Sequence, residues 1–491
     1  MSDLEEMTGT RAAPAAAPQR MTGQQKLALA VLLGAQFMLA ADFSILTVSL
    51  PVIGDSLGFS LDSLQWITTG FALPAAGFTL LFGRIGDLFG RRRMFLLGIV
   101  LLAAASLVGG LAQSSTMLVA ARVAQGVATA ISVPSALSLL TTTFPEGPLR
   151  QRALGLNGAL LGGGFSAGAL LGGALTELFS WRWSFLINVP VALLVLVGTL
   201  AVIPENRTGG HTKLDVPGAV TVSAGLLALV FGITTAGHQG WGEPGVYIWL
   251  AAAVVLLVAF WFIELKSPNP LAPVRVLKRR TVRWGNFGGF ASIAMATAIS
   301  FTTTLYMQKV LGFSAFTTGV VIGLPGVLTI IGGTIAPKLL ARIGAPAVLA
   351  LSLVVQSVGY AVLLWLNDGN SGAVLVLVAL AVGFFGHAYS LVSYMVTATS
   401  GLPDEEQGLA TGLTTMSMQI AITLGIPVVS AVIAARTSAL EKTRSATDAV
   451  LGGLHAGVIV NALFLLASAL IVWLFLGRGR AAGADTKGGA R

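Results

Sequence analysis

The amino-acid sequence predicts an all-α polytopic membrane protein. Of its 491 residues, 55% are hydrophobic and only 10% are charged, and the mean hydropathy is +0.85. A soluble domain usually carries about 25% charged residues, so this composition excludes a water-exposed globule. Apolar runs of about 20 residues recur along the chain, which is the length that a helix needs to cross a ~30 Å hydrocarbon core.

Fourteen such runs follow one another, and each predicts one transmembrane helix with edges good to a few residues. The predicted spans are 27–50, 63–83, 94–112, 116–141, 153–177, 183–203, 217–237, 245–265, 284–308, 316–338, 346–366, 373–398, 408–435 and 454–477. An even number of spans places both termini on the same side of the membrane.

The basic residues indicate which side that is. Lys and Arg total 29, and 23 of them fall in the tails or in connections on the side of the termini. Because connections rich in Lys and Arg stay in the cytoplasm, we expect cytoplasmic tails at 1–26 and 478–491 in a bacterial inner (cell) membrane. The net charge of +9 therefore reflects orientation and not a nucleic-acid partner, since no basic cluster is interleaved with aromatic residues.

The spans group as six, two and six. The longest basic connection, 266–283, is rich in proline and follows two spans that lack the motifs described below. We predict a six-helix bundle over 27–203, two inserted helices with a basic cytoplasmic linker over 204–283, and a second six-helix bundle over 284–477. Two six-span halves are typical of an internally repeated transporter whose site lies between the halves near the bilayer midplane.

Asp42 is the only carboxylate well inside a predicted span. A carboxylate at that depth is costly unless it is protonated, paired or facing water, so an intramembrane acid is by default a functional hypothesis. A carboxyl group that can gain and lose a proton there is a candidate proton carrier. The alternative is a structural ion pair that only fixes helix packing.

Arg122 is the only basic residue inside a predicted span, at a depth from which a long side chain reaches Asp42. One buried charge of each sign suggests mutual compensation, because removing either partner leaves the other unpaired. A cation that approaches Asp42 and releases it on protonation would couple the proton to substrate. A purely structural pair remains the alternative.

Two glycine patterns accompany these charges. The stretch from Gly83 to Arg93 should form a tight cytoplasmic turn, whose arginines anchor it at the lipid surface. Its motif residues are Gly83, Gly86, Asp87, Gly90, Arg91 and Arg92. In the fifth span, Gly164, Gly168 and Gly172 recur every four residues beside Gly173, and such a stripe lets another helix pack closely or slide.

Polar and aromatic residues in other spans are candidates for a substrate cavity or for contacts between helices. The cavity candidates are Phe37, Gln125, Tyr306, Gln308, His387 and Gln419, with Trp66 and Phe71 as further aromatics. Glu177 and Glu264 lie at span ends, where we expect them to be solvated.

The sequence does not favour an enzyme. It has no Gly-rich phosphate loop followed by Lys and Ser or Thr, no metal-ligand spacing among its four histidines, and no nucleophile elbow. Cysteine is absent, which excludes thiol chemistry. We therefore expect no metal and no cofactor, with the proton gradient as the energy source.

Several motifs together resemble the major facilitator superfamily, specifically its 14-span drug:proton antiporters of the multidrug or quaternary-ammonium resistance type. Gly83–Arg93 resembles the cytoplasmic loop signature, and Leu118 to Gly126 resembles the fourth-span signature, whose arginine is implicated in proton coupling. Asp42 to Pro51 and Trp181 to Pro190 resemble segments of the first and sixth spans of that group. The resemblance implies the major facilitator fold with 14 helices, and it implies that Gly164 to Gly173 form an antiport motif.

Three positions differ from the group's pattern. Ala169 stands where the exporters' signature has a proline, and Ser44 and Thr47 stand where Thr and Asn are usual. The first difference leaves proton symport open beside antiport.

We expect a monomeric proton-coupled exporter that expels amphipathic drug-like or antibiotic compounds by alternating access, with Asp42 and Arg122 in proton coupling. One alternative is a dedicated exporter of a single endogenous metabolite or antibiotic, and another is a proton symporter of the same fold. A non-transporting scaffold or sensor is disfavoured by the buried charges, and a channel by the lack of a filter sequence.

Overall fold

The structure is a computed structural model that describes residues 21–476, apart from 60, 65, 145–147, 205–214, 269, 271–273, 368, 370 and 403. The described residues are helical or lie in short connections, and none of them forms a strand. Residues 1–20 of the predicted tail over 1–26, the whole predicted tail over 478–491, and residues 205–214 of the predicted insertion therefore lie outside the described residues.

The helices of the N-terminal part are α1 (Gly23–Leu57), α2 (Leu61–Leu64), α3 (Trp66–Phe89), α4 (Arg91–Gly110), α5 (Ser115–Thr143), α6 (Pro148–Leu178), α7 (Trp183–Leu186) and α8 (Asn188–Val202). Two further long helices are α9 (Val216–Gln239) and α10 (Pro244–Lys266). The C-terminal part contains α11 (Val274–Leu277), α12 (Arg280–Leu305), the π-helix η1 (Tyr306–Val310), α13 (Ala315–Ile343), α14 (Ala345–Ala361), the 3-10 helix η2 (Val362–Trp365), α15 (Gly372–Thr399), α16 (Asp404–Glu441) and α17 (Ala446–Leu476).

Each predicted span is occupied by helix. Within the described residues, twelve helical segments are long and apolar enough to cross a membrane. The other two predicted spans, 63–83 and 153–177, fall on α3 and α6, which have 24 and 31 residues. A helix of that length spans a ~30 Å core at 1.5 Å per residue. The multi-span membrane fold is thus established, and the count of fourteen remains a prediction.

Local sequence signals set the helix ends. At the start of α1, Thr22 and Gln25 form a capping box, in which each side chain accepts from the backbone of the other. Gly58 ends α1 in the left-handed conformation at φ +69°, which glycine adopts without a Cβ penalty. Pro190 lacks an N–H to bond Leu186, and the sixth predicted span is accordingly interrupted at Ile187, between α7 and α8.

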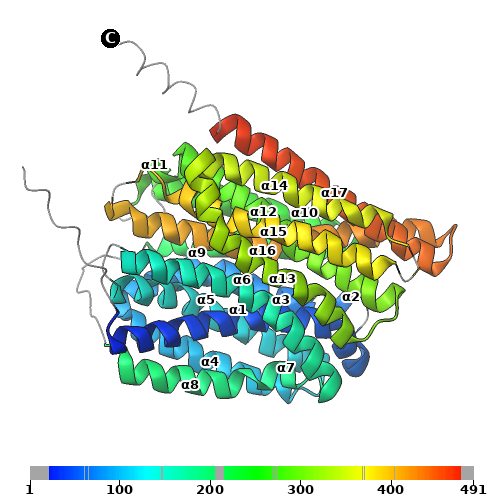
Figure 1. Ribbon diagram of the computed structural model, residues 1–491, viewed down its shortest axis with the longest axis horizontal. Coiled ribbons are helices and arrows are strands. Elements are labelled where there is room, and N and C mark those ends of the chain that lie inside the picture. The colour runs from blue at the N-terminus through cyan, green and yellow to red at the C-terminus, as the bar shows by residue number, and fades with distance from the viewer. Residues whose placement is uncertain are drawn as a thin grey trace, which may run out of the picture.

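The two parts of the chain lie side by side. In Figure 1 helices α1 to α8, coloured blue to green-cyan, form one side of the bundle, and helices α12 to α17, coloured green to red, form the other. The start of α1 and the end of α17 lie at the same end of the molecule. Each side has its own apolar core: one includes Leu32, Phe95 and Leu139, and the other includes Leu353, Leu380 and Leu465.

The two helices predicted to be an insertion, α9 and α10, pack beside the seam between the two sides. α9 contacts both α3 and α16, and α10 packs on α9. Phe231 of α9 lies between Trp66 of α3 and Trp249 of α10, with ring centroids 5.7 and 4.8 Å apart. Only 11% of the most apolar window of α10 is buried, so this helix offers its side chains to lipid.

Candidate functional site

Asp42 lies in the interior of the N-terminal bundle. Its helix, α1, is buried at every position from Ala41 to Pro51, and the Asp42 side chain is 1% exposed. Asp42 is therefore shielded from solvent by protein on every side, and its charge has to be met by neighbouring helices.

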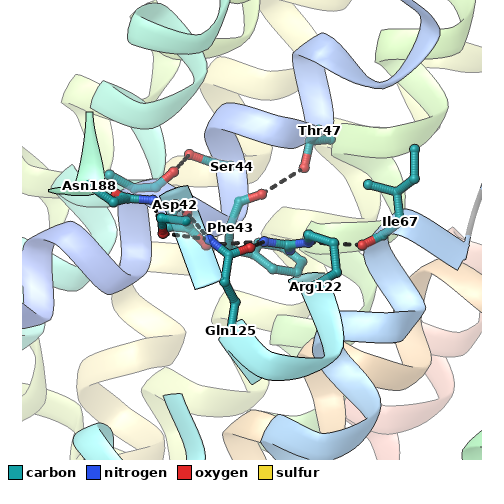
Figure 2. A network of polar contacts seen from close by, with 10 residues as sticks. Asp42, Phe43, Ser44, Thr47, Ile67, Arg122, Gln125 and Asn188 are labelled. Carbon is teal, nitrogen blue, oxygen red and sulfur yellow. Dashed lines mark hydrogen bonds and ion pairs between the residues drawn. The ribbon is translucent and has the colours of Figure 1, made fainter. Parts of the chain in front are cut away.

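Three donors converge on the Asp42 carboxylate (Figure 2). Nη1 of Arg122 lies 3.2 Å from Oδ2, Nε2 of Gln125 lies 3.3 Å from Oδ1, and the Nδ2 of Asn188 also donates to Oδ1. Arg122 and Gln125 come from α5, one turn apart, and Asn188 comes from the start of α8. The prediction that Arg122 reaches Asp42 is thus realised in the structure.

The donors also bond to one another. Nη1 of Arg122 donates to Oε1 of Gln125 at 2.7 Å, and Nε2 of Gln125 donates to Oγ of Ser106 at 2.8 Å. Asn188 also donates to that hydroxyl, at 3.4 Å. Helices α1, α4, α5 and α8 therefore meet in a single polar cluster inside an apolar bundle, and the orientation of the carboxylate is fixed from several sides.

The rest of the Arg122 guanidinium contacts α3. Nε donates to the carbonyl oxygen of Ile67 at 3.0 Å, and Cζ lies 4.2 Å from the centroid of the Phe71 ring. Such a cation–π contact is favourable, and more so where the cation is desolvated. Arg122 is itself only 1% exposed, so the pair is closed off from water.

A glycine brings Phe71 to this arginine. Gly126 follows Arg122 by one turn, and a Cβ there would lie 2.5 Å from Cγ of Pro74 and would also meet the carbonyl oxygen of Phe71. Real Cβ atoms do not approach that closely, so only glycine lets α5 and α3 pack at this distance. Close packing of α5 on α3 therefore explains the glycine at the end of the segment Leu118 to Gly126.

A cavity of about 180 Å³ lies between the two sides of the molecule. Its walls come from α1, α3, α5 and α6 on one side and from α12, α13, α15 and α16 on the other. Most of the lining is apolar, and the described lining residues include no Asp, Glu, Lys or Arg. A cavity of this kind, apolar with a few polar groups, is the default binding site for a small molecule.

The ion pair lies behind the wall of this cavity. Phe43 and Phe71 line the cavity, with ring centroids 6.1 Å apart, whereas Asp42, Arg122 and Gln125 are not among the lining residues. Phe71 therefore has the cavity on one side and the Arg122 guanidinium on the other. A molecule that moves this ring also changes the surroundings of Arg122.

Of the predicted cavity residues, His387 and Gln419 line the cavity, as does Phe71. The prediction is corrected for Phe37, Gln125, Tyr306 and Gln308. Gln125 belongs to the Asp42 cluster, and Phe37 packs by its backbone oxygen against Gly164. Tyr306 is fully buried in the C-terminal core, where its hydroxyl bonds the carbonyl oxygen of Asn367.

Gln308 joins the two sides of the molecule. Its Nε2 donates to the carbonyl oxygen of Val48 at 3.0 Å, and the next residue, Lys309, lies 4.0 Å from Asp55. The backbone N–H of Phe316 donates to Glu177 at 3.1 Å. These contacts all lie near the end at which α1 and α6 finish, so the two sides are closed against each other there.

The glycine stripe of α6 faces α1 directly beside Asp42. A Cβ at Gly164 would lie 2.9 Å from that of Ala40, one at Gly168 would lie 2.8 Å from Cα of Ala41, and one at Gly172 would lie 2.9 Å from Cα of Ile45. The three glycines therefore let α6 touch the α1 backbone. Gly173 faces the other side of the molecule, and its Cβ would lie 2.7 Å from the carbonyl oxygen of Ala315 in α13.

The stretch from Gly83 to Arg93 is less of a turn than its sequence indicates. Residues up to Phe89 continue α3, and Gly90 alone connects to α4, at φ +103°. Gly83 and Gly86 face α5, where Cβ atoms would lie 3.5 Å from Pro134 and 3.6 Å from Ser135. Arg92 donates to the carbonyl oxygen of Leu200 in α8 at 3.1 Å. The Asp87 side chain lies outside the described residues.

Two members of the polar cluster, Asn188 and Ser106, were not predicted. Asn188 has a signal, because it is the one amide in an otherwise apolar sixth span. Ser106 has none, since single serines are common in membrane helices. The prediction that Glu264 is solvated is wrong. Its side chain is 3% exposed and lies with Asp215 against Gly218, where α9 begins.

Comparison with known proteins agrees with this architecture. The sequence profile described as Major Facilitator Superfamily matches residues 32–426. The cephamycin export protein CmcT of Amycolatopsis lactamdurans is 34% identical over 441 residues, which cover 88% of this chain and 90% of that protein. The puromycin resistance protein pur8 of Streptomyces alboniger is 34% identical over 477 residues, or 94% and 93% of the two chains. The crystal structure of the human organic anion transporter MFSD10 (TETRAN) superposes with a TM-score of 0.60 at 18% identity, covering 92% of this chain and 100% of that one.

Proposed function

The chain belongs to the major facilitator superfamily, and on that premise we propose that it is a proton-coupled exporter of amphipathic antibiotic-like compounds. Relatives at 34% identity over nearly the whole chain are an export protein and a resistance protein for antibiotics. Export of a small molecule out of the cell is therefore the direction that its relatives favour over uptake.

One observation carries the proposal: a sealed Asp–Arg pair stands one aromatic ring away from an apolar cavity between two bundles. The cavity supplies a place for the compound, and the pair supplies a group that can hold a proton. A scaffold or sensor has no need of a buried charge beside a cavity, because burying two ions costs several kcal/mol each before their attraction offsets it.

The hydrogen bonds around Asp42 support one particular proton step. Among the described residues, every group that hydrogen-bonds its oxygens is a donor: a guanidinium N–H and two amide N–H groups. This arrangement fits an ionised carboxylate. A protonated Asp42 adds an O–H to a ring of donors, so at least one donor has to turn away. Proton uptake thus loosens the hold of Arg122 on Asp42.

Phe71 connects that step to the cavity. Its ring packs against the Arg122 guanidinium and also forms part of the cavity wall. In this proposal, a compound that presses on this wall shifts Arg122 toward Asp42, which is the opposite of what protonation of Asp42 does. Occupancy of the cavity and protonation of Asp42 therefore compete for the same arginine, as antiport requires.

The closed end indicates the state of the transporter. The contacts between the two sides, from Gln308 to Val48 and from Lys309 to Asp55, lie at the end opposite the start of α1. With both termini in the cytoplasm, as the basic residues predict, that end faces outward. The structure then represents a conformation closed to the outside, and alternating access requires these contacts to separate.

The energy supply is sufficient. A proton that moves inward across ~100 mV gains about 2.3 kcal/mol before any pH gradient is added. Since about 1.4 kcal/mol corresponds to a tenfold ratio, one proton supports more than a tenfold gradient of an uncharged compound. We place the protein in a bacterial inner membrane as a monomer, without cofactor, metal or nucleic-acid partner.

Proton release in inside-out vesicles tests the proposal. Vesicles with an acidic lumen receive a panel of antibiotics and lipophilic cations, for wild type, Asp42→Asn and Asp55→Asn. Asp55 is the matched control, since it is on the same helix but its side chain is 80% exposed. We expect substrate-triggered alkalinisation of the lumen in wild type and Asp55→Asn, and none in Asp42→Asn.

The proposal fails if Asp42→Asn retains that response. A response to a single compound of a broad panel would instead identify a dedicated exporter, and acidification of the lumen would indicate the opposite coupling, which is symport. The test for symport is informative because Ala169 stands at the position of the exporters' usual proline.

A further inference from the structure

The C-terminal wall of the cavity carries a chain of three uncharged polar side chains. Nδ1 of His387, in α15, lies 2.8 Å from Oγ of Ser292 in α12, and this hydroxyl donates to Oε1 of Gln356 in α14 at 3.1 Å. Nε2 of Gln356 donates to the carbonyl oxygen of Ser352 at 3.4 Å, which fixes the orientation of the amide. Ser292 and Gln356 are buried behind the wall, and His387 is the member that lines the cavity.

This chain determines which ring nitrogen of His387 holds the hydrogen. A hydroxyl has one proton, and Ser292 gives it to Gln356, whose carbonyl oxygen can only accept. Ser292 must therefore accept from an N–H on Nδ1 of His387. In the neutral ring the other nitrogen, Nε2, then carries a lone pair. No hydrogen bond joins Nε2 to another described residue, so the cavity wall presents a hydrogen-bond acceptor.

The opposite wall adds a second polar group. Gln36 of α1 lines the cavity at 3% exposure, and its Oε1 has no hydrogen-bond partner among the described residues. A buried polar atom without a partner costs about 1–3 kcal/mol, so the amide has bonding capacity that an occupant can use. Gln36 and His387 come from the two different bundles, and one ligand between them contacts both.

The cavity has no charged group to attract a cation. The described lining residues include no carboxylate, and the nearby Asp42 is enclosed by Arg122, Gln125 and Asn188 behind Phe43 and Phe71. A permanent cation therefore gains only dispersion and ring contacts here. An uncharged compound with an N–H or O–H gains a hydrogen bond as well, in surroundings where that bond does not compete with bulk water.

We propose that this cavity selects amphipathic compounds by a hydrogen-bond donor that they present to Nε2 of His387, with the Gln36 amide as the second polar contact, and that positive charge is not required. The statement rests on the proposed export function and narrows its substrate class. Ser292 and Gln356 are positioning residues, because they hold the ring with Nε2 toward the ligand without touching it.

Binding of three probes to the purified full-length protein tests the proposal. The probes are chloramphenicol, which is uncharged and has O–H and N–H donors, its N,O,O-trimethylated ether, which lacks every O–H and N–H donor, and tetraphenylphosphonium, a cation without N–H or O–H. Affinity is measured at one fixed pH by quenching of intrinsic tryptophan fluorescence. We expect chloramphenicol to bind roughly three- to tenfold more tightly than its ether, and tetraphenylphosphonium to bind no better than the ether.

Variants of His387 separate recognition from packing. In His387→Gln the terminal amide oxygen can occupy the place of Nε2, so preference for chloramphenicol over its ether should largely remain. In His387→Asn the amide can still bond Ser292 but offers no acceptor to the cavity. Chloramphenicol and its ether should then bind this variant with about equal affinity. Gln36→Leu should weaken both uncharged probes together. His455→Asn is the control, since His455 bonds the carbonyl oxygen of Leu366, away from the cavity.

The proposal is overturned if the ether binds as tightly as chloramphenicol in wild type, if tetraphenylphosphonium binds best, or if none of the three binds. It is also overturned if His387→Asn keeps the preference. These failures differ from failure of the export function, because they concern equilibrium binding, whereas the Asp42→Asn vesicle experiment concerns proton movement.

Discussion

Each of the two bundles contains a polar cluster in its membrane-spanning part, and the two clusters differ in charge and in access to the cavity. The N-terminal bundle encloses an Asp42–Arg122 pair with two amides and a hydroxyl, all sealed from the cavity. In the C-terminal bundle the cluster at the cavity consists of the uncharged groups Ser292, Gln356 and His387, and the last of these lines the cavity. A buried charge is costly to separate from its partner, whereas a neutral side chain can change partners at little cost.

This difference suggests that the N-terminal cluster binds the proton and the C-terminal cluster binds the compound. The sealed pair suits a proton, which can be exchanged for the interaction with Arg122 without a large movement. The neutral chain suits a compound, because it offers a hydrogen bond without requiring a counter-charge. Phe71 lines the cavity and packs on Arg122, so its ring connects a ligand in the cavity with the guanidinium.

The largest expected effect is on the charged cluster. Arg122→Leu leaves Asp42 buried without its cation, and we expect a loss of about 3–5 kcal/mol in unfolding free energy. Combining it with Asp42→Asn should recover most of that loss, because no unpaired charge remains. Unfolding in mixed micelles with increasing denaturing detergent measures both variants. Equal stability of Arg122→Leu and wild type would remove the distinction between the two bundles.

The next effect concerns the contact between α1 and α6 beside Asp42. Gly172→Ala places a Cβ 2.9 Å from Cα of Ile45 and closer still to its carbonyl oxygen, and overpacking of this kind costs roughly 1–3 kcal/mol. Gly333→Ala is the matched control, since Gly333 is also helical but has no atom within 4 Å of the added Cβ. We expect the control to be neutral or slightly stabilising. The same unfolding assay checks both, and equal effects would mean that the stripe is not a close contact.

Substitution of two phenylalanines of the cavity wall should affect two different properties of transport. Phe71→Leu removes a cation–π contact worth about 0.5–2 kcal/mol, so proton release per transported compound should fall roughly two- to tenfold. Phe384→Leu changes the wall on the C-terminal side, and should raise the half-saturating concentration without changing that ratio. Simultaneous measurement of compound and proton fluxes distinguishes them. If the two variants behave alike, Phe71 has no special connection to Arg122.

The smallest effect is expected at the closed end. Lys309 and Asp55 are 4.0 Å apart and largely solvated, and exposed pairs of this type contribute about 0–1 kcal/mol. Lys309→Gln should therefore leave transport within about twofold of wild type, and any difference should shrink in 0.5 M salt. Initial efflux rates at low and high salt test this. A large, salt-resistant defect would show that this pair takes part in closure.

The sequence predicted the fold and the central pair for simple physical reasons. Runs of apolar residues with the length of a membrane span leave no other regular structure possible. Asp42 and Arg122 could be paired from sequence because a single buried acid and a single buried base have to compensate each other. Both inferences depend on costs that any arrangement of the helices would have to meet.

The remaining features depend on how each helix is rotated about its axis, which composition does not determine. Tyr306 and Gln308 are polar residues of one span, yet Tyr306 is packed in the core and Gln308 bridges the two bundles. Gln125 follows Arg122 by three residues and so belongs to the ion pair and not to the cavity. The wall formed by Phe43 and Phe71 is likewise visible only when the helices are assembled.

Proton release by the purified protein in weak buffer tests the central claim most directly. A transported antibiotic is added to wild type and to Asp42→Asn at the same protein concentration, and binding and pH are recorded together. The account predicts that both proteins bind the compound, and that only wild type releases protons as Arg122 returns to Asp42. If Asp42→Asn binds the compound and releases as many protons as wild type, the buried pair is structural and the proton is carried elsewhere.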